Sequence, residues 1–276
     1  MEQAFWNPLH FLEKLFDRNQ ELLQNNEFNQ PANTILVKKL DWDSEFFNAD
    51  IFKLEFIPDI QDLPATIEEV ISLSLATNRW NVFAEVPSEE IHCFSKLTSW
   101  GFQLVETRFT YYHTLDKIQE ENVCVREAGI LDIPSLKATA SGAVNLFDKY
   151  HADPFFSIED ANRYLETYIE NCVNGFAEKV FVPDLPAPSS FVALGRIQYP
   201  GFDVFPLYRI PLTACLPANK GMHYHLCLHA LLYAKSQSAK CLVMTTQSTN
   251  KAVIHNCEKL GFKFGSCTHL FSKSSN

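Results

Sequence analysis

A short loop around residue 220 holds the residue types that could bind an anion. An apolar, β-prone run from Leu207 to Leu216 ends at Pro217, and apolar residues then recur at helical spacing up to Ser236. The loop between them contains Lys220 and Gly221. The first N–H groups of a helix have no intrahelical partner, and the helix dipole favours negative charge there. These residues therefore predict a binding site for a phosphate or diphosphate group.

Two further elements follow this loop. The residues Ala239–Thr246 form an apolar run typical of a buried strand, and Asn250–Leu260 predict a short helix that ends at Gly261, a residue favoured at helix C-termini. The last third of the chain is therefore expected to form a strand, loop, helix, strand, helix unit. In this unit Asn250 could act as the N-cap of the final helix.

The order and spacing of these elements resemble the acyl-CoA-binding core of the GCN5-related N-acetyltransferases, the GNAT superfamily. The segments Thr245–Asn250 and Cys257–Phe262 carry the most specific part of this resemblance. In that family a strand makes main-chain hydrogen bonds to pantetheine, and a Gln/Arg-x-x-Gly-x-Gly/Ala loop binds the pyrophosphate. The resemblance implies acetyl-CoA as co-substrate, with cofactor contacts from Ala214, Cys215, Leu216, Asn219, Lys220, Gly221, Met222, His223 and Asn250.

The chain differs from the family pattern at three positions. In the loop only Gly221 matches, because Ala218 occupies the first slot and His223 the last. We expect a side chain at His223 to crowd a backbone that normally lies close to phosphate. The slot of the tyrosine that protonates the departing CoA thiolate in many relatives holds Cys257. A thiol, with a reference pKa of about 8.5, could donate that proton, and the alternative is an apolar filler.

A second motif suggests an acceptor site. The segments Leu40–Phe47 and Tyr150–Pro154 resemble the two-domain GNAT branch typified by dTDP-fucosamine acetyltransferase, which implies a nucleotide-linked amino sugar as substrate. An amine must lose its proton to attack a thioester, so His151 and Asp153 are candidate proton acceptors. By the same resemblance, Tyr150, His151 and Asp153 are expected to contact the substrate. The alternative for Asp153 followed by Pro154 is a turn without chemistry.

The resemblance implies an α/β (α+β) fold with mixed, mainly antiparallel sheets. The expected organisation is an N-terminal helix and linker over 1–33, a partial GNAT-like domain over 34–117 and the acetyltransferase domain over 122–274. The segment Leu97–Tyr112 aligns with the chain from Cys257 onward, which places Gly101 over Gly261. This match predicts a weak internal duplication.

Composition limits the partners. The net charge is −10 in 276 residues, which argues against nucleic acid or an anionic membrane as a partner. The eight cysteines include no Cys-x-x-Cys pair, and no apolar run approaches the ~20 residues that span a bilayer. We therefore expect a soluble cytoplasmic protein with a small-molecule substrate, and a homodimer is left open. No metal is expected, because His223, His225 and His229 lack the carboxylate of an HExxH motif.

Three functions stay open at this point. The first is acetyl transfer from acetyl-CoA to the primary amine of a nucleotide-linked amino sugar, by direct attack and without a covalent enzyme intermediate. The second is acyl transfer to an amine of a protein or a small metabolite. The third is a non-catalytic protein that binds CoA or another ligand with the same fold.

Overall fold

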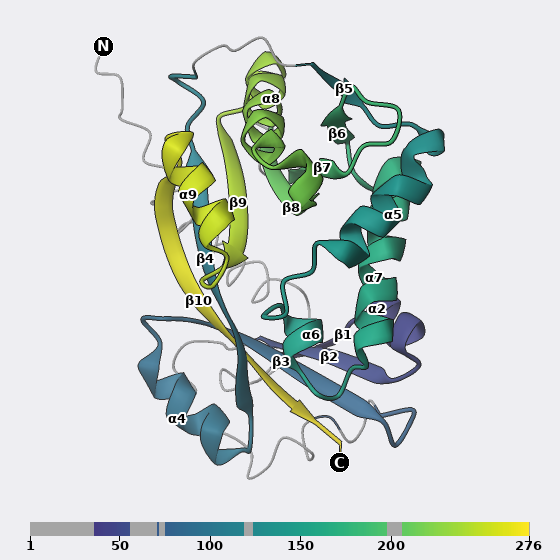
Figure 1. The fold of residues 1–276 in the computed structure, drawn as a ribbon. Helices are drawn as coiled ribbons and strands as arrows, with labels where there is room; N and C mark the ends of the chain where they lie inside the picture. The colour runs from purple at the N-terminus through teal and green to yellow at the C-terminus, as the bar shows by residue number, and fades with distance from the viewer. Residues whose placement is uncertain (1–35, 56–70, 72–74, 119–123, 198–205, 276) are drawn as a thin grey trace, which may run out of the picture. The chain divides into compact units, whose positions relative to one another are not determined.

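The computed structural model describes residues 36–55, 71, 75–118, 124–197 and 206–275 (Figure 1). The N-terminal helix and linker expected over 1–33 lie outside these residues. The described chain divides into two compact units. Unit 1 contains the residues up to Thr107 and those from Cys267 onward, and unit 2 is Arg108–Ser266.

Unit 1 is a small sheet with two described helices. Its strand β1 pairs antiparallel with β2, β2 pairs parallel with β3, and β3 pairs antiparallel with the last part of β10. Apolar side chains of the strands and of the helix α4 form its core, among them Phe52, Leu97 and Phe271. The elements are β1 (Leu36–Lys39), α2 (Asp41–Phe47), β2 (Asp50–Glu55), β3 (Trp80–Pro87), α4 (Ile91–Ser99) and parts of β4 (Gln103–His113) and β10 (Lys263–Ser274).

The motif at Leu40–Phe47 forms α2, a helix that the sequence did not predict. The Ser44 hydroxyl accepts a hydrogen bond from the Ile51 N–H at 3.0 Å and donates one to the Ile51 carbonyl at 3.3 Å. Both contacts tie α2 to β2, and Asn48 ends the helix in the left-handed conformation. The motif therefore serves the architecture of unit 1.

Unit 2 has a six-stranded sheet in the order β4-β9-β8-β7-β6-β5. The pair β8 and β9 is parallel, and the other neighbouring pairs in this order are antiparallel. The remaining elements of unit 2 are β5 (Val125–Glu127), α5 (Ile133–Gly142), α6 (Lys149–Ala152), α7 (Ile158–Asn171), β6 (Lys179–Pro183), β7 (Ser190–Ile197), β8 (Leu207–Cys215), α8 (Met222–Ser236), β9 (Cys241–Gln247) and α9 (Lys251–Lys259).

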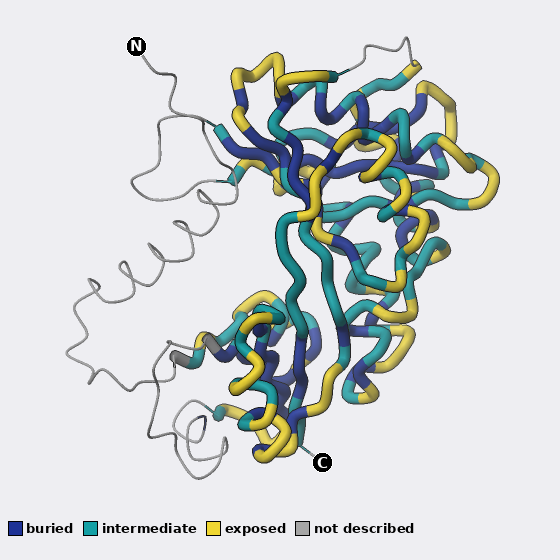
Figure 2. The backbone as a smooth tube through the Cα atoms, turned by 90° about the vertical axis from the view of Figure 1, so that its left-hand side faces the viewer, coloured by how far each residue is buried: buried dark blue, intermediate teal, exposed yellow. Residues whose placement is uncertain are grey.

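Helices cover both faces of the unit 2 sheet. Alternate residues of a strand point to opposite faces, so Val192 packs in the cluster under α8 while Phe191 packs in the cluster with α5 and α7. Buried residues accordingly follow the strands, and exposed ones gather at turns and outer helix faces (Figure 2). The α/β fold class with a large mixed sheet is confirmed. No described helix has both the length and the apolar character needed to cross a membrane.

The two similar stretches of sequence exchange their final strands. The chain passes through the parallel pair β2 and β3, then α4 and β4, and later through the parallel pair β8 and β9, then α9 and β10. The strand β4 pairs with β9, whereas β10 pairs with β3. The two compact units therefore divide inside β4, after Thr107, and inside β10, after Ser266.

The predicted repeat has the same local geometry at both sites. After α4, Gly101 has φ +84° and the Phe102 N–H donates to the Leu97 carbonyl at 3.0 Å. After α9, Gly261 has φ +83° and the Phe262 N–H donates to the Cys257 carbonyl at 2.9 Å. A helix capped in this way needs a residue that tolerates positive φ, which is why glycine occupies both positions. Common ancestry of the two halves stays a prediction.

Candidate functional site

The parallel strands β8 and β9 separate halfway along their length. They pair from Leu207 opposite Cys241 up to Ile210 opposite Met244, and both then continue without pairing to each other (Figure 1). Pro211 follows directly and has no N–H to donate. The register against β7 also shifts here, with Ala193 opposite Leu212 but Gly195 opposite Arg209, which inserts an extra residue into β8. This bulge bends β8 away from β9 and opens the sheet.

The separation leaves one edge of β8 available to a ligand. From Leu212 to Cys215 the strand pairs with β7 on its other side. The predicted cofactor contacts Ala214, Cys215 and Leu216 lie at this end of β8 or directly after it. The Ala214 side chain packs in the cluster under α5 and α7, so only its backbone faces the opening. The edge can therefore offer main-chain hydrogen bonds to an extended amide chain, as an added strand would.

The loop after β8 has the features of an anion site. A 3₁₀ turn at Pro217–Asn219 leads to Gly221, which precedes α8 with φ +96°. Within the described part of the chain, the N–H groups of Gly221 and Met222 find no backbone acceptor. A Cβ built at Gly221 would meet nothing within 4 Å, and Lys220 is exposed beside it. Two free N–H groups, an ammonium and the start of a helix are suited to a diphosphate.

Two of the predicted cofactor contacts, Cys215 and Asn219, make side-chain hydrogen bonds that hold this loop in place. The Asn219 side-chain amide donates to the Ser190 hydroxyl at 3.3 Å, and the Cys215 thiol donates to the Asn219 carbonyl at 3.1 Å. The His223 N–H is hydrogen-bonded to the Cys215 sulfur, and burial raises the pKa of this thiol above its ordinary value. These side chains therefore shape the loop, while its backbone remains available for a ligand.

The expectation for His223 is wrong. Its side chain is 7% exposed and points into the packing between α8 and α9, away from the loop. The Asn256 amide Nδ2 lies 2.8 Å from His223 Nδ1, and the Cys227 sulfur lies 3.6 Å from Nε2. Burial lowers the pKa of His223 to about 4, so the ring is neutral. The imidazole therefore does not crowd the anion loop.

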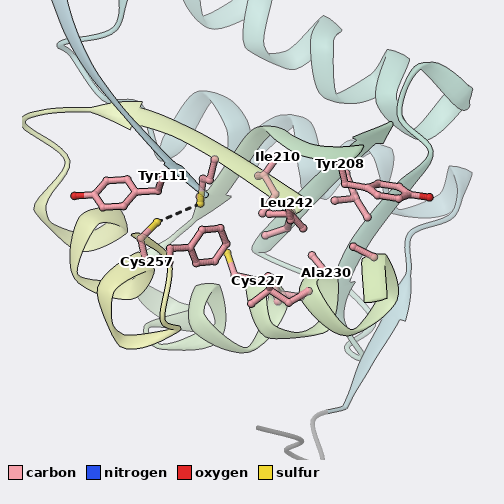
Figure 3. Packing of buried hydrophobic residues seen from close by; sticks show 14 of the residues in the cluster. Tyr111, Tyr208, Ile210, Cys227, Ala230, Leu242 and Cys257 are labelled. Atoms are coloured by element: carbon pink, nitrogen blue, oxygen red, sulfur yellow. Dashed lines mark hydrogen bonds between the residues drawn. The ribbon is translucent and has the colours of Figure 1, made fainter. Parts of the chain in front are cut away.

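The predicted proton donor Cys257 lies in the core under α8 and α9. Its side chain is 1% exposed and the thiol lies 3.5 Å from the Met244 sulfur, the dashed contact in Figure 3. Burial, with a smaller contribution from Glu258, raises its pKa to about 12. This geometry corresponds to the apolar filler, and a thiol so placed is poorly suited to protonate a thiolate. Asn250 caps α9 by accepting the Val253 N–H at 3.3 Å, as the capping alternative predicted.

The predicted proton acceptor His151 is engaged at both ring nitrogens. Nδ1 lies 2.7 Å from Asp148 Oδ2, Nε2 lies 3.0 Å from Asn162 Oδ1, and the side chain is fully buried. Burial lowers the pKa of His151, but the hydrogen bonds to Asp148 and Asn162 outweigh it and raise the pKa. Both ring nitrogens are thus engaged by oxygen atoms, and neither is left for an incoming amine. In this structure His151 joins the start of α6 to α7, and its role as a proton acceptor stays a prediction.

The other two residues of this motif are also packed. Asp153 is 4% exposed, and its carboxylate accepts the Phe155 N–H at 3.0 Å, which is the turn alternative. Tyr150 is 4% exposed, with its ring 4.4 Å from that of Tyr164 and 5.0 Å from that of Phe156. The motif forms the short helix α6 and its junction with α7. It does not present Tyr150 or Asp153 to a substrate in this structure.

The sequence reasoning missed the residues that border the opening of the sheet. The Asn145 amide Nδ2 donates to Gln247 Oε1 at the end of β9 at 2.9 Å, and the side-chain carbonyl oxygen of Asn145 accepts the Phe147 N–H at 3.1 Å. A Cβ at Gly142 would lie 3.2 Å from the Leu216 side chain at the end of β8. The connection between α5 and α6 therefore lies beside the ends of both separated strands. No motif marks these residues, because they meet from positions far apart in the chain.

One group of potential metal ligands lies in unit 1, outside the opening between β8 and β9. Among the described residues, Glu90, His92 and Cys93 of unit 1 place one ligand atom each within 4.8 Å of one another. These residues sit at the start of α4 and His92 is largely exposed. In α8, His223 faces Asn256 and the His229 ring packs 4.7 Å from Phe181, so each of these two histidines has a packing partner.

No protein-family model matches the chain, and no curated protein matches its sequence. Solved structures do match. A conserved protein of unknown function from Staphylococcus epidermidis superposes with a TM-score of 0.58 at 10% identity, covering 91% of this chain and 95% of that one. A GCN5-related N-acetyltransferase from Sphaerobacter thermophilus gives a TM-score of 0.52 at 10% identity, covering 88% of this chain and 76% of that one.

A third similar structure is a GNAT-family acetyltransferase from Colwellia psychrerythraea, with a TM-score of 0.50 at 12% identity over 82% of this chain and 78% of that one. Identity this low shows the arrangement of helices and strands alone. Together with the separated strands β8 and β9 and the glycine-capped start of α8, it shows that the chain has the fold of the GNAT acetyltransferases.

Proposed function

We propose that this protein is an acyl-CoA-dependent N-acyltransferase that moves an acetyl group from acetyl-CoA to a primary amine. The observation that carries the proposal is the separation of β8 from β9, followed directly by the free N–H groups at Gly221 and Met222. The exposed edge of β8 suits the amide chain of pantetheine, and the start of α8 suits the diphosphate. The thioester would then lie in the opening of the sheet.

The reaction balances without a covalent enzyme intermediate. The amine nitrogen forms a bond to the thioester carbonyl carbon, and the carbon–sulfur bond breaks. The amine loses one proton and the departing thiolate gains one, so protons balance. Since Cys257, His151 and Asp153 are buried and engaged, we assign this transfer to ordered water and to the substrates, with backbone N–H groups of β8 stabilising the oxyanion.

We place the amine substrate beside the connection between α5 and α6. Asn145 holds this connection against Gln247 at the end of β9, and Thr110 and Thr245 add hydroxyl groups 3.1 Å apart on the neighbouring strands β4 and β9. A nucleotide-linked amino sugar is our first candidate acceptor, on the resemblance of two sequence segments. An amine of a protein or small metabolite is the rival acceptor.

The proposal is tested by binding and by product formation. Titration calorimetry should detect acetyl-CoA binding to the full chain, and Gly221→Val should abolish it, because a β-branched residue is strained at this φ and would cover the free N–H groups. Gly129→Val is the matched control, since Gly129 has no positive φ and open space for a Cβ. Mass spectrometry over a panel of amino-sugar nucleotides, polyamines and lysine peptides then identifies the acceptor. Absence of coenzyme binding by the wild-type chain would refute the proposal.

A specific observation favours a second candidate, a non-catalytic coenzyme-binding protein. The three side chains expected to move protons, Cys257, His151 and Asp153, have buried structural roles. This candidate predicts acetyl-CoA binding without acetyl transfer to any member of the panel. The same two measurements therefore separate it from the enzyme.

A further inference from the structure

Three side chains of different chemistry meet in unit 1, at the turn between β3 and α4 (Figure 1). Glu90, His92 and Cys93 each place one potential ligand atom within 4.8 Å of the others. They offer a carboxylate oxygen, an imidazole nitrogen and a thiol sulfur. The opening between β8 and β9 lies in unit 2, so the proposed acyl transfer leaves this cluster without a role.

The imidazole and the carboxylate already have the spacing of two ligands on one metal ion. His92 Nδ1 lies 3.5 Å from Glu90 Oε2. Zinc binds such nitrogen and oxygen atoms at about 2.1 Å in a tetrahedron, which places the two ligand atoms about 3.4 Å apart. A zinc–sulfur bond of about 2.3 Å places the sulfur about 3.6 Å from each of them. The Cys93 sulfur lies within 4.8 Å of both, so a small rotation of side chains completes the site.

Backbone hydrogen bonds hold these residues on one turn of the chain. The Glu90 N–H donates to the Pro87 carbonyl at 3.1 Å, and the Cys93 N–H donates to the Glu90 carbonyl at 3.0 Å. The Cys93 side chain also packs against the apolar core of unit 1. The ligands therefore start from fixed backbone positions, and a metal ion has only side chains to order.

The charges around the cluster favour a cation. The helix dipole gives the start of α4 about half a positive charge, which opposes a cation, but Glu89 and Glu90 place two negative charges there. Among the described residues, no lysine or arginine forms an ion pair with Glu90. The ammonium of Lys96, the lysine of α4, lies 5.3 Å from the centre of the Trp100 ring. The side chains of His92 and Glu90 are 73% and 41% exposed, so an ion in solution can reach them.

We propose that Glu90, His92 and Cys93 bind one zinc ion, with water in the fourth position. Thiolate, imidazole and carboxylate are the ligands that zinc accepts, whereas Mg²⁺ and Ca²⁺ require oxygen ligands. Burial and the Glu90 carboxylate raise the pKa of Cys93, so the thiol releases its proton to solvent when the zinc–sulfur bond forms. The ion then joins the turn after β3 to the first turn of α4. This site does not depend on the proposed function, because all its ligands lie in unit 1.

Cobalt titration of the reduced full chain tests the site, because a cobalt–thiolate bond has a charge-transfer absorption band. The variants are Cys93→Ser and His92→Ala. The matched controls are Cys124→Ser and His255→Ala, which remove an exposed cysteine and an exposed histidine outside the cluster. We expect the wild type and both controls to bind one cobalt ion per chain with this band, and Cys93→Ser to lose the band. Zinc should displace the cobalt, and Mg²⁺ should not.

Zinc affinity, measured by competition with a chromophoric chelator, gives a second readout. His92→Ala should raise the Kd at least about tenfold, because even residues that only orient a metal ligand contribute that much. Zinc should also raise the Tm of the wild type and of Cys124→Ser but not that of Cys93→Ser, since a ligand stabilises only a state that binds it.

Several results would overturn the assignment. It is wrong if the wild type binds no cobalt, if Cys93→Ser keeps the charge-transfer band, or if either control loses it. It is also wrong if His92→Ala binds zinc as tightly as the wild type. Circular dichroism of each variant without metal checks folding. Because the His92 side chain is largely exposed, His92→Ala leaves the packing intact and decides the case should Cys93→Ser fail to fold.

Discussion

The side-chain amide of Asn256 lies 2.8 Å from the Nδ1 atom of His223, and this contact joins α9 to the first turn of α8. An amide N–H donates here, so Nδ1 accepts and the ring carries its proton on Nε2, facing the Cys227 sulfur. The neutral ring lets α8 begin close to α9 while the anion loop remains open. His223 occupies the last position of the loop pattern, where the pattern has glycine or alanine, and its ring links α8 to α9.

This contact predicts acid sensitivity of folding. The folded pKa of His223 is about 4, below the unfolded value near 6.5, so its neutral form contributes stability above about pH 6.5 that is lost as the pH falls toward 4. The full loss corresponds to roughly 3 kcal/mol. Urea unfolding at several pH values should show a smaller fall in the free energy of unfolding for His223→Gln than for the wild type. An identical fall for both would contradict the assignment.

The raised pKa of His151 predicts a pH dependence of stability opposite to that of His223. Its folded pKa is raised, so the charged ring contributes stability that is present below the unfolded pKa and is lost as the pH rises through the folded pKa. Asp148→Asn keeps an acceptor for the N–H groups at the start of α6 but removes the charge. We expect this variant to be less stable by about 1–2 kcal/mol at pH 6. If its loss of stability were the same at pH 6 and pH 9, the contact between Asp148 and His151 would not depend on the charge of the ring.

Substitution of Cys257 separates packing from catalysis. Cys257→Ala removes a sulfur packed against Met244, and we expect a loss of about 1 kcal/mol in the free energy of unfolding. Turnover with the best acceptor should change less than about twofold at saturating substrate, because a group outside the reaction leaves the transition state unchanged. A large fall in kcat for the alanine variant, recovered in Cys257→Ser, would instead establish a proton donor at this position.

Asn145 is expected to affect the acceptor and not the coenzyme. Asn145→Ala removes the hydrogen bond to Gln247 and releases the connection between α5 and α6. The KM for the amine should rise about tenfold while the Kd of acetyl-CoA stays unchanged. Asn171→Ala, at the half-buried last position of α7, is the matched amide-to-alanine control. If the KM for the amine and the Kd of acetyl-CoA rose equally, Asn145 would maintain the whole opening between β8 and β9 and would not act on the acceptor alone.

Strands, long helices and the anion loop were predictable because each leaves a local pattern. The bounds expected for β8 and α8 differ from the observed ones by a residue or so, and the loop between them contains Gly221 as expected. The orientation of His223, Cys257 and Tyr150 was not predictable, since burial is decided by neighbours such as Asn256, Met244 and Tyr164 that are distant in sequence or unmarked by any motif. Asn145 and Gln247, which border the separated ends of β8 and β9, were not predicted for the same reason.

The strand exchange predicts that the two halves of the sequence do not fold separately. A fragment of residues 124–276 lacks β4 and would expose an edge of β9, and a fragment ending at residue 118 lacks the β10 partner of β3. We expect neither fragment to unfold cooperatively by circular dichroism, and we expect a soluble complex when both are co-expressed. A sharp thermal transition in fragment 124–276 alone would contradict the prediction.

During synthesis on the ribosome, unit 2 is therefore completed before unit 1, although unit 1 begins first. The partner of β3 at Thr268–Ser274 is made long after β3 itself, so unit 1 cannot close until the chain has been translated through Ser274. Deletion of Thr268–Ser274 would leave the anion loop intact in the sequence, yet it would remove the partner of β3 and so disrupt unit 1, whose other strands are translated much earlier.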